Sequence, residues 1–343
     1  MKRLLRALLT AVAIAPAMAS SAPAPIAPAA EAYLMQAIGI LRQRHIGSAG
    51  ADWDTIVARA RVEAAGAQHP AETYRAIRGV LATLGERHSF LVPPPSTGTG
   101  AIARPSAPRW VSGRLPTSRL IHGRIGEVAL PELNTIRPDG EAAGNAYRAA
   151  LRAALLRLDG APLCGWVIDL RNNGGGNMWP MLQGLDPLLG QAPFGFFVAP
   201  NGQSALWQRE GGSIRTSLKA AAPEEPTFAL KGGAAPIAIL LGPRTMSSGE
   251  MTAIALLGRA DVRTFGARTA GFTTANAPIR MPDGAYLVVT ETFVRDRTGR
   301  DYRGAIIPDE PTKDSDVEQA AIRWIEGQCG KRDNGMPSRL ARP

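Results

Sequence analysis

The stretch from Pro236 to Gly258, PIAILLGPRTMSSGEMTAIALLG, constrains the fold most, because an apolar strand stops at a Gly-Pro pair and an Ala/Leu-rich helix follows at once. Two serines, Ser247 and Ser248, lie at the corner. A hydroxyl at such a junction faces the positive end of the helix dipole, and neighbouring backbone N–H groups can stabilise an oxyanion. A nucleophilic serine is therefore the hypothesis to test at this corner.

The same corner also fits ordinary helix capping. Thr245, Ser247 and Ser248 are residue types that favour helix N-termini, and Glu250 has the spacing of a capping box. Most strand-to-helix junctions carry such residues without performing chemistry. Taken alone, the corner favours capping, and a catalytic interpretation needs support from other parts of the chain.

The first 19 residues have the layout of a secretory signal peptide. Lys2, Arg3 and Arg6 precede an apolar run that ends in the small-x-small triplet Ala17-Met18-Ala19. The run is too short to be a convincing membrane span. We therefore expect a periplasmic or secreted protein with no stable membrane span after cleavage, and a retained N-terminal anchor is the alternative.

Charge and metal-binding patterns exclude several functions. Part of the net charge of +10 lies in the signal segment, and the other arginines are scattered without a basic run, so no nucleic-acid partner is expected. Two cysteines and four dispersed histidines give no metal-ligand spacing, and no cofactor is expected. Export permits a disulfide between Cys164 and Cys329, and a buried free thiol at Cys164 is the alternative.

Composition and periodicity divide the chain into successive segments. We expect a signal peptide at 1–19, an Ala/Pro linker at 20–30, an N-terminal helical region at 31–90, a Pro/Gly-rich linker at 91–123, an α/β core at 124–328 and a C-terminal tail at 329–343. Core elements are predicted as strands at 124–130, 165–170 and 262–265, helices at 140–158 and 314–325, and a hairpin at 279–294 that turns at 282–284. Strands that alternate with helices imply parallel pairing.

A second informative motif is WVIDLRNNGGGN, from Trp166 to Asn177. Three consecutive glycines after a buried strand allow positive φ and leave backbone N–H groups unshielded, so the loop can approach a ligand closely and donate to an anion. The Lys-Ser/Thr that closes a P-loop is absent, as is the glycine spacing of a dinucleotide fingerprint. A role beside a reacting group is favoured, with a functionless turn as the alternative.

The order of these motifs resembles a known family. VIDLRNNGGG, then TMSSGE, a downstream TAG, a DG hairpin and IIPD are similar to the tail-specific (C-terminal-processing) and tricorn-type serine peptidases, over roughly 88–309. The resemblance implies an α/β fold with a crotonase-like β/α spiral core. It also implies that Ser247 is the nucleophile, with the oxyanion held by the N–H of Ser248 and a donor from the loop of Gly174, Gly175 and Gly176.

The general base departs from the commonest pattern of the family. Tail-specific members use a lysine in a Thr-x-Gly-Lys turn, and the matching stretch here is Thr269-Ala270-Gly271-Phe272. No lysine lies between Ser247 and Ile307. Tricorn-type members instead take a histidine from the end of the helical region, which matches His88 in LGERHSF. A neutral imidazole can accept the serine proton and return it to the leaving group.

A carboxylate is expected to orient the imidazole. The tricorn-type pattern implies Asp301, although DYRGAIIPD has one residue more between its Gly and Pro than the pattern, and an exposed loop aspartate is the alternative. Asp309 is expected to serve a turn. Ser89 could bridge within the site, whereas His45, His69 and His122 are interpreted as bystanders on helix surfaces or loops.

The chain is therefore interpreted as an exported serine peptidase, a hydrolase that acts on peptide or protein substrates through an acyl-enzyme. The segment 91–123 is too short for the PDZ module that many tail-specific members carry, so recognition is expected to come from the core. Two alternatives remain: a non-catalytic lipid- or peptide-binding module on the same fold, and an esterase or amidase that acts on small substrates.

Overall fold

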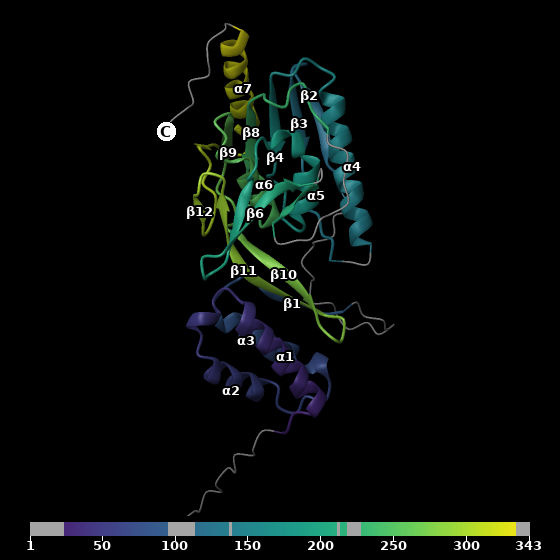
Figure 1. The fold of residues 1–343 in the computed structure, drawn as a ribbon, viewed down its shortest axis with the longest axis vertical. Helices are drawn as coiled ribbons and strands as arrows, with labels where there is room; N and C mark the ends of the chain where they lie inside the picture. The colour runs from purple at the N-terminus through teal and green to yellow at the C-terminus, as the bar shows by residue number, and fades with distance from the viewer. Residues whose placement is uncertain (1–23, 95–113, 137–138, 211–212, 218–227, 334–343) are drawn as a thin grey trace, which may run out of the picture.

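The computed structural model describes residues 24–94, 114–136, 139–210, 213–217 and 228–333 (Figure 1). The expected signal peptide lies outside the described residues, as do most of the stretch 91–123 and the last ten residues of the chain. Among the residues described, no helix is both long and apolar enough to cross a membrane.

Three α-helices form the N-terminal region at the bottom of Figure 1. They are α1 (Pro28–Arg44), α2 (Trp53–Glu63) and α3 (Tyr74–Thr83), with short 3-10 turns at Ser48–Gly50 and Pro70–Thr73. α1 starts with a proline in its first turn and ends with Arg42 and Arg44, which complement the helix dipole. Leu34, Ile38 and Leu41 form the buried stripe of α1, in the stretch where the sequence predicts helix.

A six-stranded sheet forms the centre of the upper part of the molecule. Its order is β13 (Glu310–Pro311), β9 (Val262–Gly266), β8 (Ile237–Leu241), β4 (Gly165–Asp169), β3 (Ile125–Ala129) and β2 (Thr117–Ile121). The neighbours from β13 to β3 pair in parallel, and β2 pairs antiparallel with β3. Parallel pairing, which the alternating pattern predicts, is therefore confirmed. β4 and β8 are buried along their whole length, as expected for strands covered on both faces.

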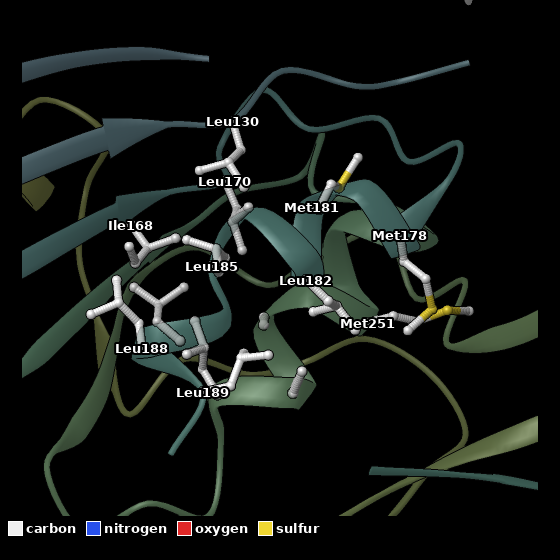
Figure 2. Packing of buried hydrophobic residues seen from close by; sticks show 14 of the residues in the cluster. Leu130, Ile168, Leu170, Met178, Met181, Leu182, Leu185, Leu188, Leu189 and Met251 are labelled. Atoms are coloured by element: carbon white, nitrogen blue, oxygen red, sulfur yellow. The ribbon is translucent and has the colours of Figure 1, made fainter. Parts of the chain in front are cut away.

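Helices cover both faces of this sheet. α7 (Val317–Asp333) packs on one face, in a cluster with Ala238 and Leu240 of β8. α4 (Gly140–Leu158), α5 (Met178–Gly184) and α6 (Ser248–Leu256) lie on the other face, in a cluster with Ile237 and Ile239. Figure 2 shows part of this second cluster, where Ile168 of β4 lies near Leu185 and Leu188, which follow α5. Alternate residues of β8 thus point to opposite faces of the sheet.

A second, antiparallel sheet of seven strands connects this layered part to the N-terminal helices. Its strands are β1 (Phe90–Val92), β5 (Gly195–Val198), β6 (Ser204–Glu210), β7 (Ser213–Thr216), β10 (Thr274–Arg280), β11 (Tyr286–Asp296) and β12 (Asp301–Tyr302). The β10–β11 hairpin packs its end against the helices through Met281 and Leu287. At the turn, Asp283 accepts hydrogen bonds from the hydroxyls of Tyr33 and Tyr74. The turn end of the hairpin is therefore fixed to the helices, and β10 runs to this end from Thr274.

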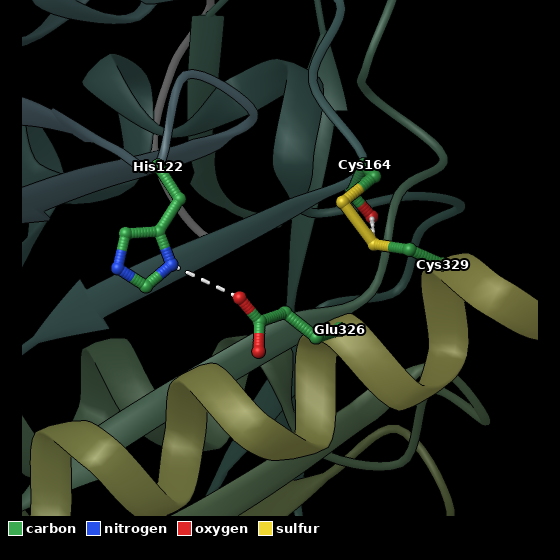
Figure 3. Close-up of a disulfide and its surroundings, with 4 residues drawn as sticks. All are labelled: His122, Cys164, Glu326 and Cys329. Carbon is green, nitrogen blue, oxygen red and sulfur yellow. Dashed lines mark hydrogen bonds and ion pairs between the residues drawn. A yellow bond between two sulfur atoms is a disulfide. The ribbon is translucent and has the colours of Figure 1, made fainter.

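The structure differs from the sequence predictions in several elements. β2 lies inside the stretch expected to be a linker, and β5, β6, β7 and α5 were not predicted. α7 begins later than expected and continues to Asp333, so the segment expected to be a tail starts inside a helix. Cys164 and Cys329 form a disulfide that joins the start of β4 to α7, which settles the alternative that the sequence left open (Figure 3). Beside it, His122 is exposed and contacts Glu326 at 3.0 Å (Figure 3).

Candidate active site

Ser247 lies at the corner between β8 and α6, in a backbone conformation that is rare for any residue other than glycine. Its φ is 52° and its ψ is −119°. The surrounding backbone is held by hydrogen bonds from the Met246 N–H to the Asn173 carbonyl at 2.9 Å and from the Ala270 N–H to the Thr245 carbonyl at 3.0 Å. Strain of this kind persists only where neighbouring structure enforces it, and it is typical of a nucleophile on a sharp strand-to-helix turn.

His88 reaches this corner from the far end of the helical region. Its Nε2 lies 3.0 Å from the Ser247 Oγ, although the two residues are 159 positions apart in the chain. Its Nδ1 lies 2.8 Å from the hydroxyl of Thr274, the first residue of β10. The residue is 9% exposed, and its ring packs against Phe272 with centroids 5.1 Å apart. Burial lowers the pKa of His88 to about 4, and the charge of Glu86 opposes this shift.

The segment that carries His88 is shaped by Glu86. The Glu86 carboxylate accepts hydrogen bonds from the backbone N–H groups of His88 and Ser89 and from the hydroxyl of Thr290. Burial alone would raise the pKa of Glu86, but interactions with its polar neighbours, His45 first and then Ser89 and Thr290, bring it down to about 2. Glu86 therefore carries a charge and fixes the turn from which the imidazole projects.

Two expectations for neighbouring residues need correction. The hydroxyl of Ser89 contacts Glu86 and Thr290, and the ring nitrogens of His88 have other partners. His45 lies in the interior rather than on a helix surface, with its Nε2 3.8 Å from Glu86. The sequence does not reveal this burial, because it comes from tertiary packing at the end of α1.

The glycine loop lies directly against Ser247. Gly175 and Gly176 have φ values of 99° and 105°, and a Cβ on Gly175 would lie 2.8 Å from that of Ser247. The Gly175 N–H already donates to the Asn173 Oδ1 at 3.0 Å. The hydroxyl of Ser248 donates to the Gly176 carbonyl at 2.7 Å and so fixes the loop to α6. The sequence places the loop correctly, but one of its three candidate N–H donors is occupied.

Glu250 has a larger role than the capping or packing expected of it. It is fully buried, and its carboxylate accepts from the N–H of Ser247 at 2.9 Å, from the N–H groups of Gly271 and Phe272 at 2.8 Å each, and from the hydroxyl of Thr269. Burial raises the pKa of Glu250, and these hydrogen bonds oppose the rise. The carboxylate thus joins Ser247 to the 269–272 turn, which matches the lysine turn of tail-specific peptidases.

The structure does not bring Asp301 to His88. Asp301 lies on β12, where its carboxylate accepts from Arg295 at 2.6 Å and lies 3.5 Å from Arg303. These two cations lower the pKa of Asp301, Arg295 first. Both ring nitrogens of His88 are occupied by hydroxyl groups. Asp309 lies just before β13, and its carboxylate accepts from the N–H and hydroxyl of Thr264 in β9, so it joins two neighbouring strands rather than serving the local turn expected of it.

Thr274 was missed by the sequence analysis, because nothing in its local pattern distinguishes it from other strand threonines. Asn276 was missed for the same reason, and its side-chain amide donates to the His88 carbonyl at 2.7 Å. Within the described residues, no group of three or more His, Cys, Asp or Glu side chains is arranged to hold a metal ion. The site thus consists of a strained serine, a buried imidazole, a glycine loop and hydroxyl partners.

Comparisons with known proteins identify the family of this chain. The model of the family described as Peptidase family S41 matches residues 124–312, which is more than half of the chain. The nisin-resistance protein of Lactococcus lactis subsp. lactis is 26% identical over 304 residues, which cover 88% of this chain and 89% of the relative. On the extent of the family match, the chain belongs to peptidase family S41.

Solved structures support the same fold. A lipoprotein from Streptococcus agalactiae superposes with a TM-score of 0.68 at 24% identity and covers 89% of this chain and 98% of its own. The photosystem II D1 C-terminal processing protease gives a TM-score of 0.53 at 16% identity, with coverage of 83% and 93%. At these identities the likeness shows the fold, a mixed α/β architecture.

Proposed function

We propose that this protein is an exported serine peptidase in which Ser247 and His88 form the catalytic pair. The observation that carries the proposal is the 3.0 Å contact between the His88 Nε2 and the Ser247 Oγ, made at a serine whose φ is positive. Membership of family S41 supports proteolysis as the reaction. The finer architecture proposed is a crotonase-like core behind an N-terminal helical region.

The proposed reaction is acyl transfer. Ser247 attacks the substrate carbonyl while His88, neutral at physiological pH because its pKa is about 4, takes the hydroxyl proton. The N–H of Ser248 and an N–H from Gly174 or Gly176 stabilise the oxyanion, since the Gly175 N–H is already bonded to Asn173. His88 then donates its proton to the leaving amine, and a water that it activates hydrolyses the acyl-enzyme.

Location and substrate follow from the segment 1–19 and from the relatives. The signal-like segment supports export, and a lipoprotein and a nisin-resistance protein among the relatives support a place at or outside the cell envelope. The substrate class proposed is peptides or proteins. Nisin is one peptide substrate to assay, because a relative of nearly the same length takes its name from resistance to it.

Labelling with a fluorophosphonate probe tests the proposal. The wild type should react, Ser247→Ala should not, and His88→Ala should react at least about a hundredfold more slowly, because the base is lost. Ser204→Ala and His69→Ala are matched controls at exposed positions and should react like the wild type. An unlabelled wild type that binds lipid would refute the enzyme in favour of a binding module. Cleavage of esters without cleavage of any peptide, nisin included, would favour the esterase alternative.

A further inference from the structure

The second ring nitrogen of His88 faces a hydroxyl rather than a carboxylate. The Nδ1 lies 2.8 Å from the Thr274 Oγ1, and the Nε2 contacts Ser247. The nearby carboxylates are engaged elsewhere: Glu86 holds backbone N–H groups, and Glu250 holds the 269–272 turn. The partner that a serine–histidine–carboxylate triad places at this nitrogen is therefore replaced by a threonine.

β10 holds His88 at two points. Thr274 contacts its ring, and the Asn276 side chain donates to its carbonyl at 2.7 Å, across an irregularity in the β10–β11 pairing between Ala275 and Asn276. Thr274 is itself fixed, because it pairs with Phe293 of β11 and follows Thr273, whose hydroxyl exchanges hydrogen bonds with Gly304. A strand that contacts both the ring and the backbone of a residue restricts its orientation.

We infer that Thr274 is the positioning residue of the catalytic pair, accepting the Nδ1–H of neutral His88 and so keeping the Nε2 lone pair directed at Ser247. This inference rests on the proposed function. A neutral imidazole carries one N–H, and the nitrogen without it is the base. In a buried ring the N–H is costly to leave unpaired, so a partner that accepts at Nδ1 selects the tautomer that can deprotonate the serine.

Substitution at Thr274 tests this role through the rate of fluorophosphonate labelling. Thr274→Val keeps the shape and removes the acceptor, and it should slow labelling roughly 10- to 100-fold. Thr274→Ser keeps the hydroxyl and should react within about threefold of the wild type. Thr292→Val is the matched control, because the Thr292 hydroxyl is buried on the neighbouring strand without a partner. It should label at the wild-type rate.

Nitrogen-15 NMR of the His88 ring supplies a readout that a purely structural role would not move. In the wild type and in Thr274→Ser the proton should reside on Nδ1, and in Thr274→Val a substantial share should move to Nε2. A wild-type ring protonated on Nε2 overturns the inference without any variant, and so does wild-type labelling of Thr274→Val. Persistent labelling of Ser247→Ala would instead overturn the proposed function itself, so the two failures are distinguishable.

Discussion

The acid limb of the pH–rate profile should lie far below that of an ordinary histidine enzyme. His88 must be neutral to take the serine proton, and burial lowers its pKa from 6.5 to about 4. The charge of Glu86 raises this pKa, and the Arg87 guanidinium lies over the Phe272 ring, 5.8 Å from its centroid. The protein should therefore remain active in mildly acidic solution.

The size of the effect follows from the two pKa values. At pH 5.5 a histidine of pKa about 4 is neutral by about 30 to 1, whereas one of pKa 6.5 is protonated by about 10 to 1. The labelling rate of Ser247 should thus change by less than about a tenth between pH 7.5 and 5.5, instead of falling about tenfold. Measurement of the second-order labelling rate between pH 3.5 and pH 8 covers both cases.

A variant that admits water to the His88 ring should move the acid limb of the pH–rate profile to higher pH. Phe272 covers His88 with its ring, so Phe272→Ser should raise the pKa of His88 and shift the limb upward by about one pH unit, while Phe272→Leu keeps an apolar cover and should not. An acid limb with a midpoint at pH 6 or above in the wild type would refute the reasoning. So would a His88 NMR titration with that midpoint.

Two further predictions concern groups that hold the site and the fold. Glu250→Gln should lower the free energy of unfolding by roughly 2–4 kcal/mol in denaturant titrations and slow labelling. The NH₂ group of the glutamine would face backbone N–H groups that now donate to the Glu250 carboxylate. Glu310→Gln, at an exposed carboxylate, is the control and should change the free energy of unfolding little. A change below about 1 kcal/mol in Glu250→Gln would contradict this account. Replacement of both Cys164 and Cys329 by alanine should cost roughly 3–5 kcal/mol, because the disulfide closes a loop of 165 residues. Labelling of the folded double variant should be unchanged, and a loss of labelling while it stays folded would show that α7 bears on the site.

Elements with a strong local pattern could be predicted from the sequence. The helix at 140–158 coincides with α4, because its apolar positions repeat at helical spacing along its whole length. β4 and β9 were predicted within a residue of their observed ends. The turn of the β10–β11 hairpin was placed correctly because Gly284, with a φ of 87°, supplies a conformation that other residues avoid.

The missed elements carry weaker local patterns. α5 contains Pro180, which argues against a helix unless it lies in the first turn, as it does here. β7 has only four residues, and the polar residues of β6 hide the alternation around the buried Trp207. β5 pairs with β6 across a turn that contains Asn201 and Gly202, and β6 pairs in turn with β7. The Asn-Gly pair is a local hairpin signal that could have found the first of these pairings.

The candidate site divides in a similar way. Ser247, the glycine loop and His88 could be named because their motifs follow the order of a known family. The third group could not, since DYRGAIIPD differs from the pattern by one residue and Asp301 is paired with Arg295. Thr274 contacts His88 only because β10 begins at that point, and a strand start is the least predictable feature of a sequence.

The absence of a lysine from the 269–272 turn and the proposed use of His88 as the base are physically linked through Phe272. The backbone N–H of Phe272 still belongs to the site, because it donates to the same Glu250 carboxylate that accepts the Ser247 N–H. Its side chain supplies an apolar wall against His88, which helps to desolvate the ring and so lowers the pKa of the imidazole. A lysine at 272 would instead place a cation beside that ring and near Arg87. The turn can therefore carry the base itself or cover a histidine base, and its Glu250 anchor serves either arrangement.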